Sequence, residues 1–479
     1  MDERPNVIMV MLDTVRSDCL GVYGGGIRAN AINRIASKAT IYDNAIAPGT
    51  YTVPSHVSFF LGQRVRDVKQ LFKDPMANSD QNTDPFLEKT KYIKPGSMTL
   101  ARKMSYLGYD TALFSNNPFV SQPTGIAEGF GHVHNLWYED NIKENSGMVK
   151  LLLKMIENDK ARKSAIKLAS IVSRGMTSGI LDKMYLDLRV TLNKHFAKQY
   201  GFYKLDRGAL RTNESIKGYL SNNESQNKFM FINYMEAHEG YPTNLVSNDY
   251  VEQDKWLYLS QIEDPSGVEP IKRAYSKRVQ YLDKQIGKLM EILKSQGALD
   301  NSVVVFAGDH GQAFMEHGQL YHNMFPYEQM TNVPLITARY LNGKQVNTKE
   351  RIHNFVSLTA LHNSILDIGY GKNEVIDGSL KRDNFVFSDH VGITEVWDTY
   401  LLKLFSKRSK SIDKIYRAKL HHNTFATAIY YKNHKLIHYF DKKMKDELFD
   451  LSSDKAESDN LIESKRTIAH QMLSHVKSS

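Results

Sequence analysis

The amino-acid sequence predicts an α/β fold, in which a mostly parallel central sheet is sandwiched by helices and a smaller α+β lobe follows at the C-terminus. Apolar runs of strand length alternate with amphipathic helical patterns along most of the 479 residues. Several of these runs end directly in acidic residues or histidines, as strands do at the carboxyl edge of a parallel sheet. This order of strand, helix and strand is typical of parallel sheets that are covered on both faces.

The first part of the sequence contains two predicted strands and two predicted helices. Residues 6–12 (NVIMVML) form a continuous apolar run, which is typical of a strand buried on both faces. A helical pattern follows at residues 29–39, and another at residues 97–107 is ended by Gly108. Residues 109–114 (YDTALF) predict the second strand.

The alternation of strands and helices resumes at residue 228. Residues 228–234 (KFMFINY) predict a strand, residues 271–296 a long amphipathic helix, and residues 302–307 (SVVVFA) a further strand. Because sites in such sheets form beyond the carboxyl ends of the strands, we expect the polar side chains that follow them to gather at one edge. These side chains are Asp13, Glu236, His238, Asp309 and His310.

The C-terminal part of the sequence has a different pattern. Beyond about residue 377 it shows short alternating strands, such as residues 426–431 and 435–439, and then a helix from about residue 464. We therefore predict a large α/β domain over residues 1–376 and a C-terminal α+β subdomain over residues 377–479.

One segment carries the whole excess of positive charge. Residues 141–220 hold 16 Lys/Arg and 7 Asp/Glu. The difference, +9, equals the net charge of the full chain. Apolar residues recur there at helical spacing, so we predict a basic helical insertion at about residues 141–225. Such helices usually present a solvated face, and the alternative is peripheral contact with an anionic membrane surface. No recognition motif accompanies the charge, so we expect no nucleic-acid partner.

Composition and cysteine content indicate a folded protein of a reducing compartment. Hydrophobic residues make up 41% of the chain and charged residues 24%, which is close to the average of globular proteins. Cys19 is the single cysteine, so no intrachain disulfide can form. The first apolar run is too short for a signal peptide or a membrane span. These observations predict a cytoplasmic location.

Two aspartates and a histidine at strand ends form a candidate metal site. Asp13 follows the first predicted strand, and Asp309 and His310 follow the strand at residues 302–307. Carboxylate and imidazole groups presented together suit one divalent cation, which would be Mn, Mg, Ca or Zn. Histidine is also the usual acid or base in catalysis, although a histidine in a surface loop more often has neither role. Three further histidines follow or flank these strands: His238, His317 and His322.

The stretch APGTYTVPSHVSFFLG at residues 47–62 allows two interpretations. In the first interpretation, the stretch is an ordinary junction between a loop and a helix, because proline and small hydroxyl residues commonly begin a helix. In the second, Thr52 is a nucleophile at a helix N-terminus, where backbone N–H groups and the helix dipole favour an anion. His56, one helical turn further on, would then contact that anion.

Four motifs in order make the chain similar to the sulfatase family of the alkaline phosphatase superfamily. NVIMVMLDTVRSDCLGVYG resembles the opening strand and first metal-ligand turn of the family, and TLARKMSYLGYDTALFSNNPFV resembles its TLA…GY.TA..SNN segment. VVVFAGDHGQAFMEHGQLYHNMFPYEQMTNVPLI resembles the second metal turn, and DELFDLSSDKAESDNLI resembles the closing signature. The resemblance covers most of the chain and implies an alkaline phosphatase-like fold.

The resemblance also implies a role for Thr52. YTVPSH matches the nucleophile motif of the family, which is Cys or Ser, any residue, Pro, Ser and Arg, with Thr52 in the place of the nucleophile and His56 in the place of the arginine. Sulfatases convert that Cys or Ser to formylglycine, and threonine is not a substrate of this modification, so formylglycine is not expected. Thr52 instead resembles the threonine of lipoteichoic acid synthases and phosphoethanolamine transferases, which use it directly and bind one Mn or Zn ion.

The metal ligands of those relatives match four residues here: Asp13, Thr52, Asp309 and His310. The first acidic ligand of the relatives is usually Glu, and Thr14 departs from the paired Asp-Asp of the sulfatases. We expect Thr52 to attack the ester. We expect His238 and His322 to bind the substrate or to protonate the leaving oxygen. We expect His56 and His317 to contact the substrate.

The predicted function is therefore a metal-dependent hydrolase of sulfate or phosphate esters that acts through a threonine nucleophile. An alternative is a phospho-group transferase, in which a lipid or glycan hydroxyl replaces water as the acceptor. A third interpretation is an inactive homologue that binds an anion, which the intact set of site residues disfavours. The expected partner is an anionic small-molecule, glycan or lipid-linked ester.

Overall fold

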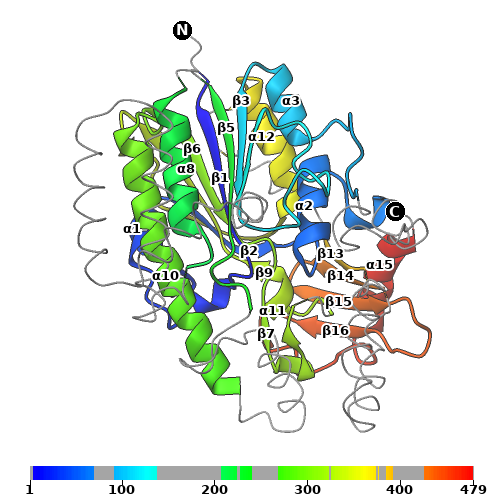
Figure 1. Ribbon diagram of the computed structural model, residues 1–479. Coiled ribbons are helices and arrows are strands. Elements are labelled where there is room, and N and C mark those ends of the chain that lie inside the picture. The colour runs from blue at the N-terminus through cyan, green and yellow to red at the C-terminus, as the bar shows by residue number, and fades with distance from the viewer. Residues whose placement is uncertain are drawn as a thin grey trace, which may run out of the picture.

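The structure is a computed structural model, and it describes residues 4–68, 91–136, 206–223, 227–239, 268–322, 325–373, 376, 385–391 and 425–477. Three sheets organise these residues: a large one in the main domain, a small one in the C-terminal lobe and a two-stranded one of β7 (Ala313–Phe314) and β8 (Leu320–Tyr321) (Figure 1). Within this part of the chain, no helix combines the length and the apolar character needed to cross a membrane.

The large sheet has ten strands, with eight in the order β12-β2-β10-β6-β1-β5-β3-β4, while β11 pairs with β10 and β9 with β2. Most of the pairs are parallel, including those of β1 with β5 and β6, whereas β10 runs antiparallel to β6 and β2. The predicted mostly parallel sheet is thereby confirmed. Its strands are β1 (Asn6–Leu12), β2 (Thr40–Ile46), β3 (Asp110–Ser115), β4 (His132–Asn135), β5 (Lys228–Tyr234), β6 (Asn301–Ala307), β9 (Asn332–Val333), β10 (Leu335–Leu341), β11 (Lys344–Gln345) and β12 (Glu350–Ser357).

Helices cover both faces of the large sheet (Figure 1). One face carries α1 (Asn30–Ala36), α8 (Ala209–Ser221) and α10 (Val268–Ser295), and the other α2 (Thr52–Leu61), α3 (Leu100–Tyr106) and α12 (Leu361–Gly369). Side chains alternate along a strand, so β1 supplies both cores at once. Ile8, Val10 and Leu12 pack into the first core, and Val7, Met9 and Met11 into the second. This double burial explains why the strand reads as one continuous apolar run.

Several predicted elements match the structure closely. The predicted strands at residues 6–12, 228–234 and 426–431 are confirmed to the residue as β1, β5 and β14. The helix predicted from residue 97 begins instead at Leu100, because the Thr99 hydroxyl accepts a hydrogen bond from the backbone N–H of Arg102 and caps the helix there.

Most of the basic insertion predicted at about residues 141–225 lies outside the described residues, namely 141–205 and 224–225. Its final part is described and forms α8, whose apolar side chains belong to the core under the sheet. They are Ala209, Ile216, Tyr219 and Leu220. This end of the predicted insertion is therefore a helix of the main domain that packs against α10.

The small sheet is antiparallel and has the order β13-β14-β15-β16. Its strands are β13 (Val386–His390), β14 (Ala426–Tyr431), β15 (His434–Tyr439) and β16 (Glu447–Asp450). Helix α15 (Arg466–Lys477) packs on it through Ala469, Met472 and Val476. The predicted boundary at residues 376/377 falls between α12 and β13, and the division into two domains stays a prediction.

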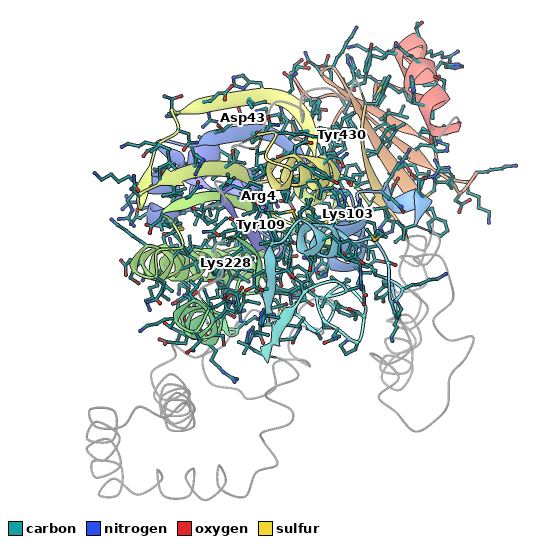
Figure 2. The ribbon with its side chains drawn as sticks, turned by 90° about the horizontal axis from the view of Figure 1, so that it is seen from above. Arg4, Asp43, Lys103, Tyr109, Lys228 and Tyr430 are labelled. Atoms are coloured by element: carbon teal, nitrogen blue, oxygen red, sulfur yellow. The ribbon has the colours of Figure 1, made fainter. Side chains whose placement is uncertain are left out.

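A buried cation joins the lobe to the main domain. The Nζ atom of Lys435 on β15 lies 2.7 Å from Glu457 and 3.1 Å from Glu328, the first residue of α11 (Glu328–Thr331). The side chains of Lys435 and Glu457 are fully buried. The hydroxyl of Tyr430, labelled in Figure 2, donates a hydrogen bond to Glu328 (2.9 Å).

We expect Lys435→Met to lower the thermal stability of the protein markedly. The change leaves the buried Glu457 carboxylate without its cation, and breaking a buried pair in this way costs about 3–5 kcal/mol. Thermal unfolding followed by circular dichroism measures the effect, with the exposed Lys455→Met as the control. Equal melting temperatures for Lys435→Met and wild type would contradict this account of the junction.

Candidate active site

The carboxyl edge of the large sheet gathers residues from three elements. Asp13 follows β1, while Asp309 and His310 follow β6, which is the parallel neighbour of β1. Thr52 is the first residue of α2. These four residues, called the primary cluster, are at most 5% exposed. The turn after His310 requires glycine, because a Cβ atom on Gly311 would overlap the carbonyl oxygen of Gln329.

The atoms of the primary cluster have the spacing of a metal-ligand shell. His310 Nε2 lies 3.4 Å from Thr52 Oγ1, 3.5 Å from Asp309 Oδ2 and 3.8 Å from Asp13 Oδ1. Two ligand atoms on a tetrahedral zinc with bonds of ~2.0–2.1 Å are about 3.4 Å apart. Asp13, Asp309 and His310 also have their ligand atoms within 4.8 Å of one another, so the four side chains are close enough together to share one divalent cation.

Hydrogen bonding engages only one oxygen of each aspartate within the described residues. Asp13 Oδ2 accepts a bond from Asn117 Nδ2 (2.8 Å), and Asp309 Oδ1 accepts bonds from the backbone N–H groups of Thr14 (3.2 Å) and His310 (2.9 Å). The second oxygens, Asp13 Oδ1 and Asp309 Oδ2, are buried and have no hydrogen-bond partner among the described residues. Buried polar atoms are normally satisfied, so these two oxygens fit a metal ion.

The electrostatics of the cluster agree with this fit. Burial raises the pKa of Asp13 to about 7, and the neighbouring Asp309 charge adds to the shift. Burial likewise raises the pKa of Asp309 to about 7 and lowers the pKa of His310 to about 4. Two buried carboxylates so close together are costly as anions unless a cation accompanies them.

A strained residue holds the two aspartates in place. Thr14 has a φ angle of 62°, which is unfavourable for a β-branched residue and costs of order 1–3 kcal/mol. In this conformation its backbone N–H points at Asp309 Oδ1. The strained turn therefore links the end of β1 to the end of β6.

The loop that precedes Thr52 is fixed from several sides. Ser55 Oγ donates a hydrogen bond to the carbonyl oxygen of Gly49 (3.1 Å), and Thr50 Oγ1 pairs with His390 Nδ1 of the lobe (3.0 Å). The N-cap residue Tyr51 makes no side-chain cap hydrogen bond among the described residues, so the first backbone N–H groups of α2 are not capped by it. Thr52 is thus presented by a rigid junction at a helix end that favours anions.

His56 lies behind Thr52 within the same helix. Its Nδ1 is 2.8 Å from the carbonyl oxygen of Thr52 and 3.7 Å from Asp309 Oδ2, and its ring packs against Phe231. The side chain is fully buried, and burial lowers the pKa of His56 to about 4. A neutral imidazole in this place supports the primary cluster, and its contact with substrate stays a prediction.

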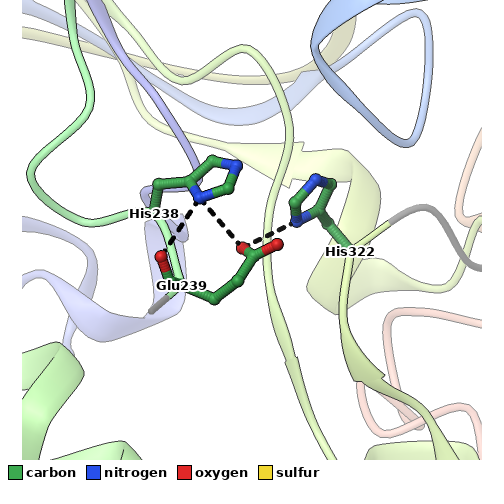
Figure 3. A group of neighbouring side chains, drawn as sticks. All are labelled: His238, Glu239 and His322. Carbon is green, nitrogen blue, oxygen red and sulfur yellow. Dashed lines mark hydrogen bonds and ion pairs between the residues drawn. The ribbon is translucent and has the colours of Figure 1, made fainter. Parts of the chain in front are cut away.

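A second group of polar side chains stands beside the primary cluster and is called the His-Glu-His cluster (Figure 3). It contains His238 and Glu239, which follow β5, and His322, which follows β8 (Leu320–Tyr321). Glu239 Oε2 lies 3.3 Å from His238 Nδ1 and 2.9 Å from His322 Nδ1. The rings of His322 and His310 are 4.8 Å apart, so the two clusters are adjacent.

Charges within the His-Glu-His cluster are strongly coupled. Burial lowers the pKa of His238 to about 3. Burial would raise the pKa of Glu239, but the two imidazoles outweigh it and hold that pKa well below its usual range. Burial also opposes a charge on His322, yet the Glu239 carboxylate raises the pKa of this histidine. Glu239 is therefore ionised at neutral pH.

His317 lies apart from both clusters in the part of the chain that the structure describes. It is exposed, and its ring stacks on Tyr327 at a centroid distance of 3.8 Å. A role for His317 in substrate binding stays a prediction.

The side chain of Glu236, which follows β5, turns to the start of α8. It accepts hydrogen bonds there from the backbone N–H groups of Arg207 (3.1 Å) and Ala209 (2.9 Å).

Two residues of the site were not predicted from the sequence. Asn117 orients Asp13, and Glu239 links His238 to His322. The sequence held a signal for each of them. Asn117 stands in the SNN motif after the strand at residues 109–114, and Glu239 directly follows a histidine at a strand end.

Comparison with known proteins gives the family. Residues 5–371 match the family model described as Sulfatase, so the chain belongs to the sulfatase family. This confirms the predicted family and agrees with the predicted enzyme class. The chain is 20% identical to an arylsulfatase of Clostridium perfringens over 71% of this chain and 70% of that protein. It matches several other sulfatases over less than two thirds of their own length.

Solved structures support the fold class. A 2-O GAG sulfatase is similar with a TM-score of 0.62 and 16% identity, covering 99% of this chain and 92% of that one. The phosphonate monoester hydrolase of Agrobacterium radiobacter is similar with a TM-score of 0.59 and 14% identity, covering 99% of this chain and 94% of that one. The predicted architecture, a large sheet between helices with a small C-terminal lobe, is thereby confirmed.

We expect Asp309→Ala to abolish metal binding at the primary cluster. The change removes Asp309 Oδ2, the buried oxygen that has no hydrogen-bond partner among the described residues. It also removes Asp309 Oδ1, which accepts the hydrogen bond from the backbone N–H of Thr14. Mass spectrometry of the metal content, after the stripped protein is incubated with one equivalent of Mn²⁺, measures the effect. The exposed Asp459→Ala is the control. Full metal occupancy in Asp309→Ala would remove this site from consideration.

Proposed function

We propose that the protein is a metal-dependent hydrolase that cleaves phosphate or sulfate esters with Thr52 as its nucleophile. The position of Thr52 carries this proposal. Its hydroxyl stands at the N-terminus of α2, 3.4 Å from His310 Nε2, near two buried carboxylate oxygens that have no hydrogen-bond partner among the residues described. A helix N-terminus, a hydroxyl and a candidate set of metal ligands are thus close together, as nucleophilic catalysis on an anionic ester requires.

Four residues would hold the cation: Asp13, Thr52, Asp309 and His310. A divalent cation bound there lowers the pKa of a hydroxyl and offsets negative charge on ester oxygens. Thr52 Oγ forms a bond to phosphorus while the bond from phosphorus to the leaving oxygen breaks, and that oxygen takes up a proton. Water then displaces the threonine, which releases phosphate and restores the hydroxyl.

An unmodified threonine favours phosphate-type esters over sulfate monoesters. A formylglycine hydrate expels sulfate by breaking its own C–O bond, with its second hydroxyl as the driving group. A sulfated threonine has no second hydroxyl on that carbon, so water would have to attack sulfur. Attack at phosphorus is a route that metal sites support well. Phosphate monoesters, phosphodiesters and phosphonates are therefore the first candidates.

Hydrolysis of sulfate esters is the second candidate, because the related proteins are named as sulfatases. The 2-O GAG sulfatase among the similar structures suggests an anionic glycan ester as the substrate class. Transfer to a lipid or glycan acceptor, a lipid-linked ester and peripheral membrane contact remain proposals that rest on the sequence. The cytoplasmic location is likewise a proposal.

We expect Thr52→Ala to lower turnover by on the order of 10³-fold or more, since it removes the group that forms the covalent bond. Thr52→Ser should retain part of the activity, and the exposed Thr348→Ala should retain all of it. Mass spectrometry of the quenched reaction should find a phosphate-sized adduct on the peptide that contains Thr52. Undiminished activity in Thr52→Ala would refute the nucleophile assignment.

A panel of substrates tests the preference for phosphorus. The purified enzyme should cleave aryl phosphate monoesters, phosphodiesters or phosphonates faster than aryl sulfates, and the mass of its Thr52 peptide should show no modification. Fast aryl sulfate hydrolysis with weak action on all phosphorus esters would overturn the substrate preference while leaving the family assignment intact.

A further inference from the structure

The His-Glu-His cluster consists of groups that bind metals. His238, Glu239 and His322 each offer one ligand atom, and the three atoms lie within 4.8 Å of one another. In Figure 3, the carboxylate of Glu239 lies between the two imidazole rings, and one nitrogen of each ring faces it. Two histidines and one glutamate form a common ligand set of catalytic zinc, which keeps a further position open.

The distances within the cluster suit a shared ion. Glu239 Oε2 is 3.3 Å from His238 Nδ1 and 2.9 Å from His322 Nδ1. Ligand atoms on a tetrahedral zinc are about 3.4 Å apart when the bonds are ~2.0–2.1 Å long. The three ligand atoms lie within 4.8 Å of one another, so the side chains would close up slightly for all three atoms to reach bonding distance of one zinc ion.

The orientation of His322 supports the same reading. Its Nδ1 atom is buried and, although it lies 2.9 Å from Glu239 Oε2, it has no aligned hydrogen-bond partner among the described residues. Buried polar atoms are normally satisfied, so this nitrogen fits a metal ion.

We propose that His238, Glu239 and His322 hold a second divalent cation, which their ligand set assigns as Zn²⁺. It would lie beside the cation of the primary cluster, since the rings of His322 and His310 are 4.8 Å apart. Paired metal sites stabilise both the attacking and the leaving oxygen of an ester. The binding of this second cation goes beyond the proposed function, whereas an action of the cation on the leaving oxygen rests on that function.

Arg207 also reaches this cluster. One of its guanidinium nitrogens lies 3.4 Å from His238 Nδ1, and another donates a hydrogen bond to the backbone carbonyl of Glu239. Zinc would replace the first contact, and the second would keep the guanidinium at the rim of the site. A cation and a guanidinium side by side are compatible when an anionic ester lies between them, because each can bind one of its oxygens.

Zinc titration of the full-length protein tests the proposal. Protein stripped with a chelator is incubated with excess Zn²⁺, passed through a desalting column and analysed by metal mass spectrometry. Wild type should retain two Zn²⁺ per chain. Glu239→Gln and His322→Gln should each retain one, Asp309→Ala should retain one, and the double variant Glu239→Gln/Asp309→Ala none. The exposed Glu463→Gln is the matched control and should retain two.

The outcomes separate this proposal from the proposed function. One Zn²⁺ in the wild type that Glu239→Gln keeps and Asp309→Ala loses, or two in both Glu239→Gln and His322→Gln, would overturn the second site. Circular dichroism confirms that each variant is folded. The result depends on stoichiometry and not on turnover, so failure of the Thr52 assignment would leave it standing.

Discussion

The site depends on two carboxylates that are buried at the ends of neighbouring parallel strands. Asp13 and Asp309 are fully buried, and in the part of the chain that the structure describes each has one oxygen held by hydrogen bonds and one oxygen without a hydrogen-bond partner. Burial alone would drive them toward the protonated state, as their raised pKa values indicate. A divalent cation would resolve this conflict, and Thr52 and His310, with their atoms 3.4 Å apart, stand beside the two aspartates where it would lie.

The sheet explains how distant parts of the chain meet there. Strand β1 is paired with β6 on one side and β5 on the other, so the residues that follow all three strands emerge at one edge. The backbone N–H of Asp13 donates to the carbonyl oxygen of Tyr234 (3.0 Å), which continues the pairing of β1 and β5 to the border of the site. Helix α2 then places Thr52 opposite these strand ends, while the lobe supports its loop through His390.

Much of the fold and the primary cluster could be predicted because both follow from local patterns. Continuous apolar runs gave the limits of β1 and β5, and parallel pairing made it probable that Asp13 and Asp309 would meet. Contacts that depend on turns could not be predicted. Left-handed conformations at Met315, His317 and Tyr321 send His317 toward Tyr327 and His322 toward Glu239, although only four residues separate the two histidines. For the same reason, the sequence did not show that His238 pairs with Glu239, the residue next to it.

The central claim is that a cation lies among Asp13, Thr52, Asp309 and His310. Anomalous diffraction from crystals grown with Mn²⁺ or Zn²⁺, recorded on both sides of the absorption edge of the metal, tests it most directly. The account predicts a strong anomalous peak within bonding distance of Asp13 Oδ1, Asp309 Oδ2, His310 Nε2 and Thr52 Oγ1. Well-ordered crystals with no peak among these four atoms, at a metal concentration that supports activity, would contradict it.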